Sequence, residues 1–272
     1  MPKQALPALS RHASLALVLG LPALALVAVL GPGGPLPQDP AYHEFADRRV
    51  WLGMPRAGDV LTNLAFVFAG LAGLARLCGP PARRPVFHHR GEGAIWSMFF
   101  VAMLLTGAGS VWYHLAPDNA RLVWDRLPMA AGFASLFCAA LADRVDGGTA
   151  TRLLAPLVAL GVASVLFWAY TESVGRGDLR PYAFVQFYLL LAIPLLLVAF
   201  KGRYTHGGEW WLMITLYLAA KLAEAFDAEI FALVKVLSGH SLKHLLAAAA
   251  AFACLHMLVR RRPLLHEGAV GT

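Results

Sequence analysis

Eight apolar runs, separated by short polar breaks, constrain this chain more than any other feature of its sequence. A helix needs about 20 mostly apolar residues to cross a bilayer. Backbone N–H and C=O groups find no water in hydrocarbon, so a segment that crosses it must be a helix or belong to a closed barrel. Runs of this length favour helices. The sequence predicts spanning helices at 13–30, 59–78, 95–115, 123–142, 152–171, 181–200, 210–230 and 240–259.

The composition agrees with a membrane protein. Hydrophobic residues make up 58% of the 272 residues and charged residues only 14%, whereas a soluble domain is about a quarter charged. We therefore expect an all-α polytopic bundle of seven transmembrane helices with one additional N-terminal transmembrane helix. Residues 1–58 would form that helix and an outer loop, 59–262 the seven-helix domain and 263–272 a cytoplasmic tail. The boundary near "FDAEIFALVKVLSG" stays open, because this stretch could be a helix end followed by a short interfacial piece.

The formal charge of +7 does not indicate a nucleic-acid partner, since the basic residues are spread over short loops. More of them fall on the side that holds both termini, and that bias places the termini in the cytoplasm. We expect the protein to lie in a bacterial inner membrane, with the side opposite to the termini facing the periplasm. The first run could instead be a signal peptide, but no A-x-A cleavage pattern follows Leu30, so an uncleaved helix is favoured. No obligate protein partner is indicated.

Five polar residues stand near the ends of apolar runs: Ser110, His114, Asp125, His240 and His244. Ser110/His114 and His240/His244 are spaced i, i+4, so each pair shares one helix face. With the predicted orientation, all five lie on the outer side at similar depth. Ionisable residues at membrane depth are costly and usually mark function.

Three imidazoles with an open fourth position are typical of a catalytic zinc site, where the pKa of bound water falls to about 7. His114, His240 and His244 are the predicted ligands. Asp125 is the candidate general acid/base, and the Ser110 hydroxyl could bond the water or a developing oxyanion. A lone histidine on an apolar helix is more often a satisfied core residue, so the prediction depends on the five residues together. The residue after His240 is Ser241, so the H-E-x-x-H pattern of zincin proteases is absent.

Ser110-x-x-x-His114, Asp125 in the next helix and His240-x-x-x-His244 opening the last helix together resemble the signature of the alkaline ceramidases. Their wider superfamily of seven-helix hydrolases includes the adiponectin and progestin receptors and the Per1-type proteins. "DVLTNLAFVFAGL" is similar to the ceramidase W-N-x-x-S-N-L-P-F stretch, with Asp59 and Asn63 in its two Asn places. The resemblance covers roughly 59–259 and implies zinc on the three histidines, catalysis assisted by the aspartate and support from the serine.

The same resemblance implies calcium as a second metal, bound near the N-terminus. In this chain that region reads "QDPAYHEFADRRVWLGMP" and cannot be aligned residue by residue. Asp39, Glu44 and Asp47 are the candidate ligands; the alternative is a solvated loop.

Charged residues also occur in the seventh run, where Lys221, Glu224 and Asp227 share one stripe, and Arg126 and Lys243 adjoin two of the site residues. Intramembrane charges pair or line a cavity. Two interpretations remain open: ion pairing that closes the outer end of the bundle, and headgroup binding at the mouth of an active site.

The sequence thus predicts a zinc-dependent integral membrane hydrolase that cleaves an amide bond in a membrane lipid, ceramide or another N-acyl lipid. The alternative is a receptor-like or lipid-binding membrane protein with a structural zinc and little turnover. A transporter is a third hypothesis, disfavoured because no internal or inverted repeat is visible.

Overall fold

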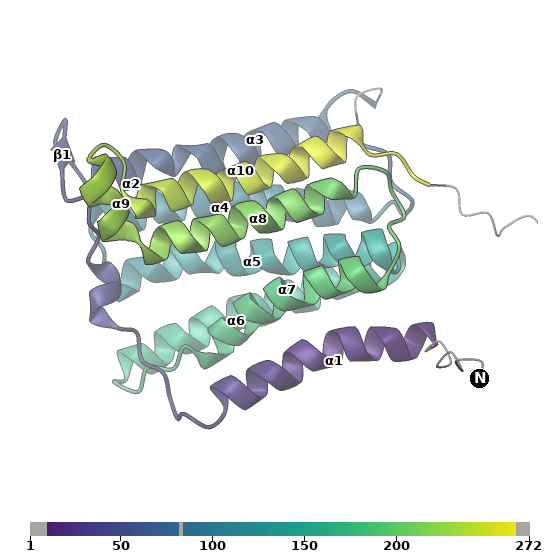
Figure 1. Cartoon of the computed structure of the whole chain (residues 1–272), viewed down its shortest axis with the longest axis horizontal. Helices are drawn as coiled ribbons and strands as arrows, with labels where there is room; N and C mark the ends of the chain where they lie inside the picture. The colour runs from purple at the N-terminus through teal and green to yellow at the C-terminus, as the bar shows by residue number, and fades with distance from the viewer. Residues whose placement is uncertain (1–9, 82–83, 265–272) are drawn as a thin grey trace, which may run out of the picture.

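The computed structural model describes residues 10–81 and 84–264, which form a helical bundle with one short β-hairpin (Figure 1). The hairpin pairs β1 (Val50–Trp51) with β2 (Met54–Pro55) antiparallel, and η1 (Pro40–His43) precedes it. The helices are α1 (Arg11–Leu30), α2 (Ala57–Thr62), α3 (Leu64–Cys78), α4 (Glu92–Leu115), α5 (Asn119–Arg144), α6 (Gly147–Ser173), α7 (Arg180–Ala199), α8 (Gly208–Ala225), α9 (Asp227–Val234) and α10 (Gly239–Arg260).

Several helices begin where a side chain satisfies a free backbone N–H of the first turn. Asp118 accepts from the amide of Arg121 at the start of α5, with a distance of 2.7 Å. Ser238 accepts from the amide of Ser241 at the start of α10, at 2.9 Å. This second cap fixes where α10 begins and therefore where its two histidines lie.

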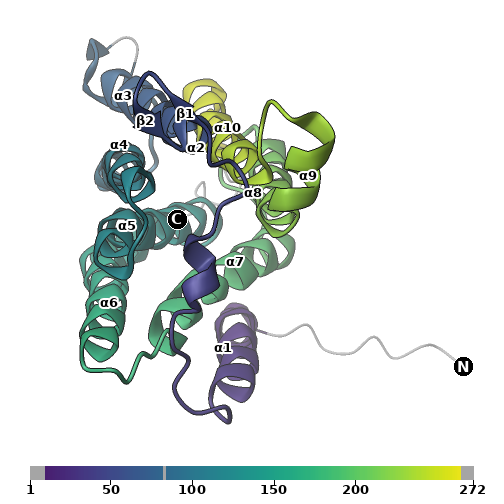
Figure 2. The ribbon, with the colours of Figure 1, turned by 90° about the vertical axis from the view of Figure 1, so that its left-hand side faces the viewer.

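The long helices run side by side, and α5 lies between α4 and α6 and also packs against α7 (Figures 1 and 2). Close approach between neighbours depends on small residues. A Cβ at Gly70 would lie 2.7 Å from Leu104 N on the facing α4. A Cβ at Gly109 would lie 2.8 Å from the Trp124 carbonyl carbon, so this glycine brings α4 against α5 one residue before Ser110.

The two ends of the bundle differ. The first residues of α1 and the last residues of α10 lie at the same end (Figure 1). The other end carries the hairpin, α2 and α9, and the segment that contains η1 crosses it (Figure 2). Both described chain ends therefore lie away from the end where α4 finishes and α10 starts.

Six helical stretches in the described part of the chain are long and apolar enough to cross a membrane, which indicates a multi-pass membrane protein. They are His12–Leu30, Ala57–Cys78, Glu92–Leu115, Gly147–Ser173, Arg180–Ala199 and Gly239–Arg260. The other two long helices, α5 and α8, are more polar: α5 carries Asp125 and Arg126, and α8 carries Lys221 and Glu224. The all-α prediction is confirmed.

The predicted helix at 210–230 is wrong in its C-terminal part. The helix α8 ends at Ala225 and α9 is a separate short helix, which is the open alternative noted above. Asp227, the first residue of α9, holds this turn in place, because its two carboxylate oxygens accept from the amides of Ala46 and His240 at 2.9 and 2.7 Å. Of the predicted tail, 263–272, residues 265–272 lie outside the described residues.

Candidate metal centre

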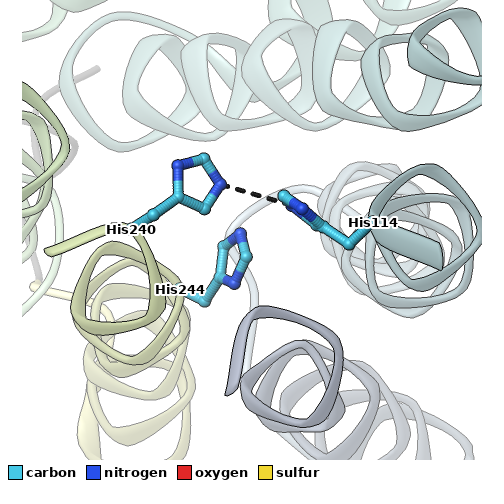
Figure 3. A group of neighbouring side chains, drawn as sticks. All are labelled: His114, His240 and His244. Atoms are coloured by element: carbon cyan, nitrogen blue, oxygen red, sulfur yellow. Dashed lines mark hydrogen bonds between the residues drawn. The ribbon is translucent and has the colours of Figure 1, made fainter. Parts of the chain in front are cut away.

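Three histidines from two helices point toward one another at the end of the bundle that carries the hairpin (Figure 3). His114 belongs to the last turn of α4, and His240 and His244 occupy the first two turns of α10. We call these residues the histidine triad. The sequence spacing predicted this convergence, and the structure places all three side chains together.

The geometry of the triad suits a metal ion. The ligand atoms lie within 4.8 Å of one another, and the Nε2 atoms of His114 and His240 are 3.2 Å apart. Zinc–nitrogen bonds of about 2.0–2.1 Å at tetrahedral angles place two imidazole nitrogens about 3.3 Å apart. The three residues are only 1–4% exposed. Among residues 10–81 and 84–264, this is the group of histidine, cysteine and acidic side chains that could hold a metal.

His244 is oriented by Thr62 of α2. The Thr62 hydroxyl donates to the carbonyl of Gly58 at 2.8 Å, and its oxygen lies 3.0 Å from Nδ1 of His244. Because a hydroxyl has one hydrogen, its oxygen accepts the Nδ1–H of His244. This arrangement leaves the Nε2 lone pair free, as in metal sites where a second residue fixes the histidine tautomer.

His240 is positioned through its backbone. Its amide donates to Asp227, and the other oxygen of Asp227 accepts from Ala46. The neighbouring Phe45 packs its ring over two members of the triad, with centroid distances of 4.6 Å to His114 and 4.4 Å to His240. The segment after η1 therefore covers the triad at this end of the bundle.

A second set of contacts anchors the start of α10. The hydroxyls of Ser238 and Ser241 both donate to Oδ1 of Asp59, at 3.0 and 2.6 Å. Arg49 donates to the carbonyls of Lys235 and Val236, just before α10. Its guanidinium also donates to Asp47, and those hydrogen bonds hold the pKa of the Asp47 carboxyl below its usual value of 3.8.

Ser110 and Asp125 meet beside the triad. They face each other across the α4–α5 contact, and the Ser110 side chain lies close to the Asp125 carboxylate. Both are buried, with exposed fractions of 3% and 9%. They line the same cavity as His244 of the triad.

The cavity has a volume of about 340 Å³ and a mostly apolar wall. It runs between the helices from the polar group of Ser110, Asp125 and His244, and it includes Phe187 of α7, which is 42% exposed. Phe187 therefore belongs both to the cavity wall and to the exposed surface of α7. Its apolar lining includes Phe66, Phe99, Met103, Met129, Phe133, Leu136, Met213 and Ala251.

The proposed calcium ligands have other partners. Asp39 caps η1 by accepting from the amide of Ala41, and Asp47 is paired with Arg49. Glu44 is exposed and lies 3.6 Å from Arg48. In the described part of the chain these three acids form no metal-type cluster.

Sequence reasoning missed Thr62, Asp227 and Phe45 as supports of the triad. Thr62 and Phe45 are ordinary residues for a helix and a loop, and no spacing pattern connects them to a histidine far away in the chain. Asp227 was grouped with Lys221 and Glu224 by its spacing of three. The break after Ala225 separates it from that stripe.

No protein-family model, curated protein or solved structure matches this chain. The geometry of the site is therefore what indicates a function.

Proposed function

We propose that this protein is a zinc-dependent integral membrane hydrolase that cleaves an amide bond in a lipid, ceramide or another N-acyl lipid. The observation that carries the proposal is the buried histidine triad at the end of an apolar cavity that also presents Asp125 and Ser110. A cavity of this kind accommodates an acyl chain, and the polar group at its end would meet the amide.

His114, His240 and His244 would hold the zinc. When bound, the metal would supply a water that is nucleophilic at neutral pH and would polarise the substrate carbonyl. The set contains three neutral ligands and neither a thiolate nor a carboxylate. This is the ligand set of zinc sites that keep one position open for water.

Asp125 would manage the protons of the reaction. Water adds to the amide carbon, the C–N bond breaks, and a fatty acid and an amine leave. The carboxylate of Asp125 would accept the proton from the water and return it to the departing nitrogen. The surrounding apolar wall limits bulk water, which strengthens these interactions.

Ser110 would act by orienting Asp125. Its single hydroxyl hydrogen cannot serve the carboxylate and a developing oxyanion at once. The contact between the two side chains therefore favours Ser110 as a positioning residue, in place of the oxyanion role considered from the sequence.

We also propose the full topology of seven helices plus an N-terminal one in a bacterial inner membrane. Both termini would be cytoplasmic, and the triad would lie toward the periplasm. The first residues of α1 and the last residues of α10 lie at the same end of the bundle, which supports this arrangement. The excess of basic residues on that side supports it as well.

The test is hydrolysis of a lipid panel by the zinc-loaded protein in detergent, measured as released fatty acid. The panel contains ceramide, a second N-acyl lipid and an ester lipid. Asp125→Asn is expected to keep its zinc and to lose roughly 10²- to 10⁴-fold in rate, because its amide cannot take a proton. Glu229→Gln, an exposed change on α9, should leave the rate unchanged.

Undiminished hydrolysis by Asp125→Asn would refute the assignment of the base. Zinc binding without turnover of any amide or ester would refute hydrolysis and favour the receptor-like alternative.

A further inference from the structure

The cavity wall beside the catalytic group carries more positive than negative charge. Two carboxylates line the cavity, Asp125 and Glu224, together with three cations, Arg126, Lys221 and Lys243. Charges at membrane depth are retained where they have a partner or line a cavity that holds one. Each of the three cations is therefore expected to have a negative partner in the wall or in a bound ligand.

The two lysines share one carboxylate. Lys243 is the residue before His244, and its Nζ lies 2.9 Å from Oε1 of Glu224. Lys221 pairs with the other carboxylate oxygen of Glu224. This trio has one negative and two positive charges. It is part of the cavity wall, so its excess positive charge lies where a ligand would lie.

Arg126 has a still greater deficit of negative partners. It is 6% exposed and stacks on Trp168 and Tyr182, with 4.3 and 5.0 Å from its Cζ to the ring centroids. Its Nη2 donates to Gln38 at 2.7 Å, whereas its Nη1 is buried without a hydrogen-bond partner. No carboxylate of the described residues forms an ion pair with it.

A buried guanidinium with an unused N–H group and no ion-pair partner is costly. The aromatic stacking fixes the plane of Arg126, and a planar donor fork of this kind matches a carboxylate or a phosphate. An anion carried by a ligand in the cavity would satisfy Nη1 and offset the excess charge of the lysines.

We infer that the cavity binds an amphiphile with an anionic headgroup, a carboxylate or phosphate that pairs with Arg126 near Lys243 and Lys221 while the acyl chain follows the apolar wall. Where the inference concerns the lipid that is cleaved, it rests on the proposed function. The preferred substrate would then be an N-acyl lipid with an acidic group close to its amide.

The experiment compares binding of three amides that have the same acyl chain. N-dodecanoylglycine carries a carboxylate, N-dodecanoyl-O-phosphoethanolamine a phosphate, and N-dodecanoylethanolamine no charge. Binding to the full-length protein in detergent is measured with and without zinc. We expect at least one anionic amide to bind roughly tenfold or more tightly than the neutral one. The better of the two anions identifies the headgroup.

Arg126→Gln should remove most of that preference, and Arg126→Lys should keep part of it. Arg121→Gln is the matched control on the same helix, because Arg121 stacks on Trp112 and is not part of the cavity wall. Lys221→Gln is a second variant at a half-exposed position, and it should reduce the preference severalfold even if the Arg126 variants do not fold.

Equal binding of the neutral and anionic amides by the unmodified protein would overturn the inference, as would a preference unchanged in folded Arg126→Gln. The two proposals fail separately. Arg126-dependent binding of an anion without turnover would refute hydrolysis alone. Hydrolysis of neutral amides without an anion preference would refute the headgroup inference alone.

Discussion

Each member of the histidine triad depends on a residue that is not itself a metal ligand. Thr62 accepts from His244, Asp227 accepts from the amide of His240, and Phe45 packs over His114 and His240. Thr62 fixes the tautomer and direction of the His244 imidazole, whereas Asp227 positions the backbone of His240 and Phe45 restricts the ring positions of His114 and His240. The metal affinity of the site should therefore respond to these residues individually.

Thr62→Val tests this dependence. The change keeps the shape of the side chain and removes the acceptor of the His244 Nδ1–H, so zinc affinity is expected to fall about 10- to 100-fold. Chelator competition measures the affinity. Thr106→Val is the matched control, because its buried hydroxyl lines the same cavity and has no hydrogen-bond partner. Equal zinc affinities of the two variants would show that the Thr62 contact does not orient the ligand.

At the scale of single residues, the sequence predicted the histidine triad and missed the residues that position it. His240 and His244 are four residues apart on one helix, and the helical repeat alone brings them to one face. No comparable local rule brings Thr62 to His244, because that contact depends on how α2 lies against α10. Long-range contacts between ordinary residues follow from packing and leave no spacing signal.

Among the elements, α4 and α5 determine whether Ser110 and Asp125 can meet. The backbones approach closely at Gly109, where a Cβ would lie 3.3 Å from the Asp125 nitrogen and closer still to Trp124. A side chain there must push the helices apart. The spacing of these two helices therefore controls the geometry of the proposed base.

Gly109→Ala is expected to lower the free energy of unfolding by about 1–3 kcal/mol through overpacking and to reduce hydrolysis with it. Gly20→Ala on α1 is the control, since a Cβ there has no neighbouring atom within 4 Å. That change should be neutral or slightly stabilising, because alanine favours the helix. Thermal unfolding in detergent compares the two. A Gly109→Ala protein as stable as Gly20→Ala would contradict the close packing.

The positions of the helices were largely predictable from hydropathy, because each apolar run must either span the bilayer or be buried inside the bundle. An exception is the stretch from 210 to 230, where the mostly apolar run continues past the end of α8 at Ala225. The turn that follows is held by Asp227, whose carboxylate accepts from the amides of residues 46 and 240. An apolar pattern cannot report a break that is stabilised by distant backbone groups.

For the whole molecule, the triad lies at the end of the bundle opposite to the described chain ends. The segment between α1 and α2 crosses that end and covers the histidines. Under the proposed function, the lipid would therefore enter from the side of the bundle. The exposed Phe187 on the cavity wall marks one such side. Under the proposed function, the orientation of the protein in the membrane decides which compartment receives the amine that hydrolysis releases.

Labelling of single cysteines tests the orientation. Cys78 is exposed at the end of α3, on the side predicted to be cytoplasmic, whereas Cys138 and Cys254 are buried. In intact bacterial spheroplasts, an impermeant thiol reagent should label Arg48→Cys and should leave Cys78 unlabelled until the membrane is opened. Labelling of Cys78 in intact spheroplasts would reverse the proposed topology.

The central claim is that His114, His240 and His244 bind zinc, and the most direct test is the metal content of the purified full-length protein. The wild type should hold about one zinc per chain, as expected for a three-histidine site. The double variant His240→Ala/His244→Ala should hold none. His256→Ala, which changes an exposed histidine of the same helix, is the control and should retain the metal. A wild type without zinc after zinc loading, or a double variant that still binds it, would contradict the account.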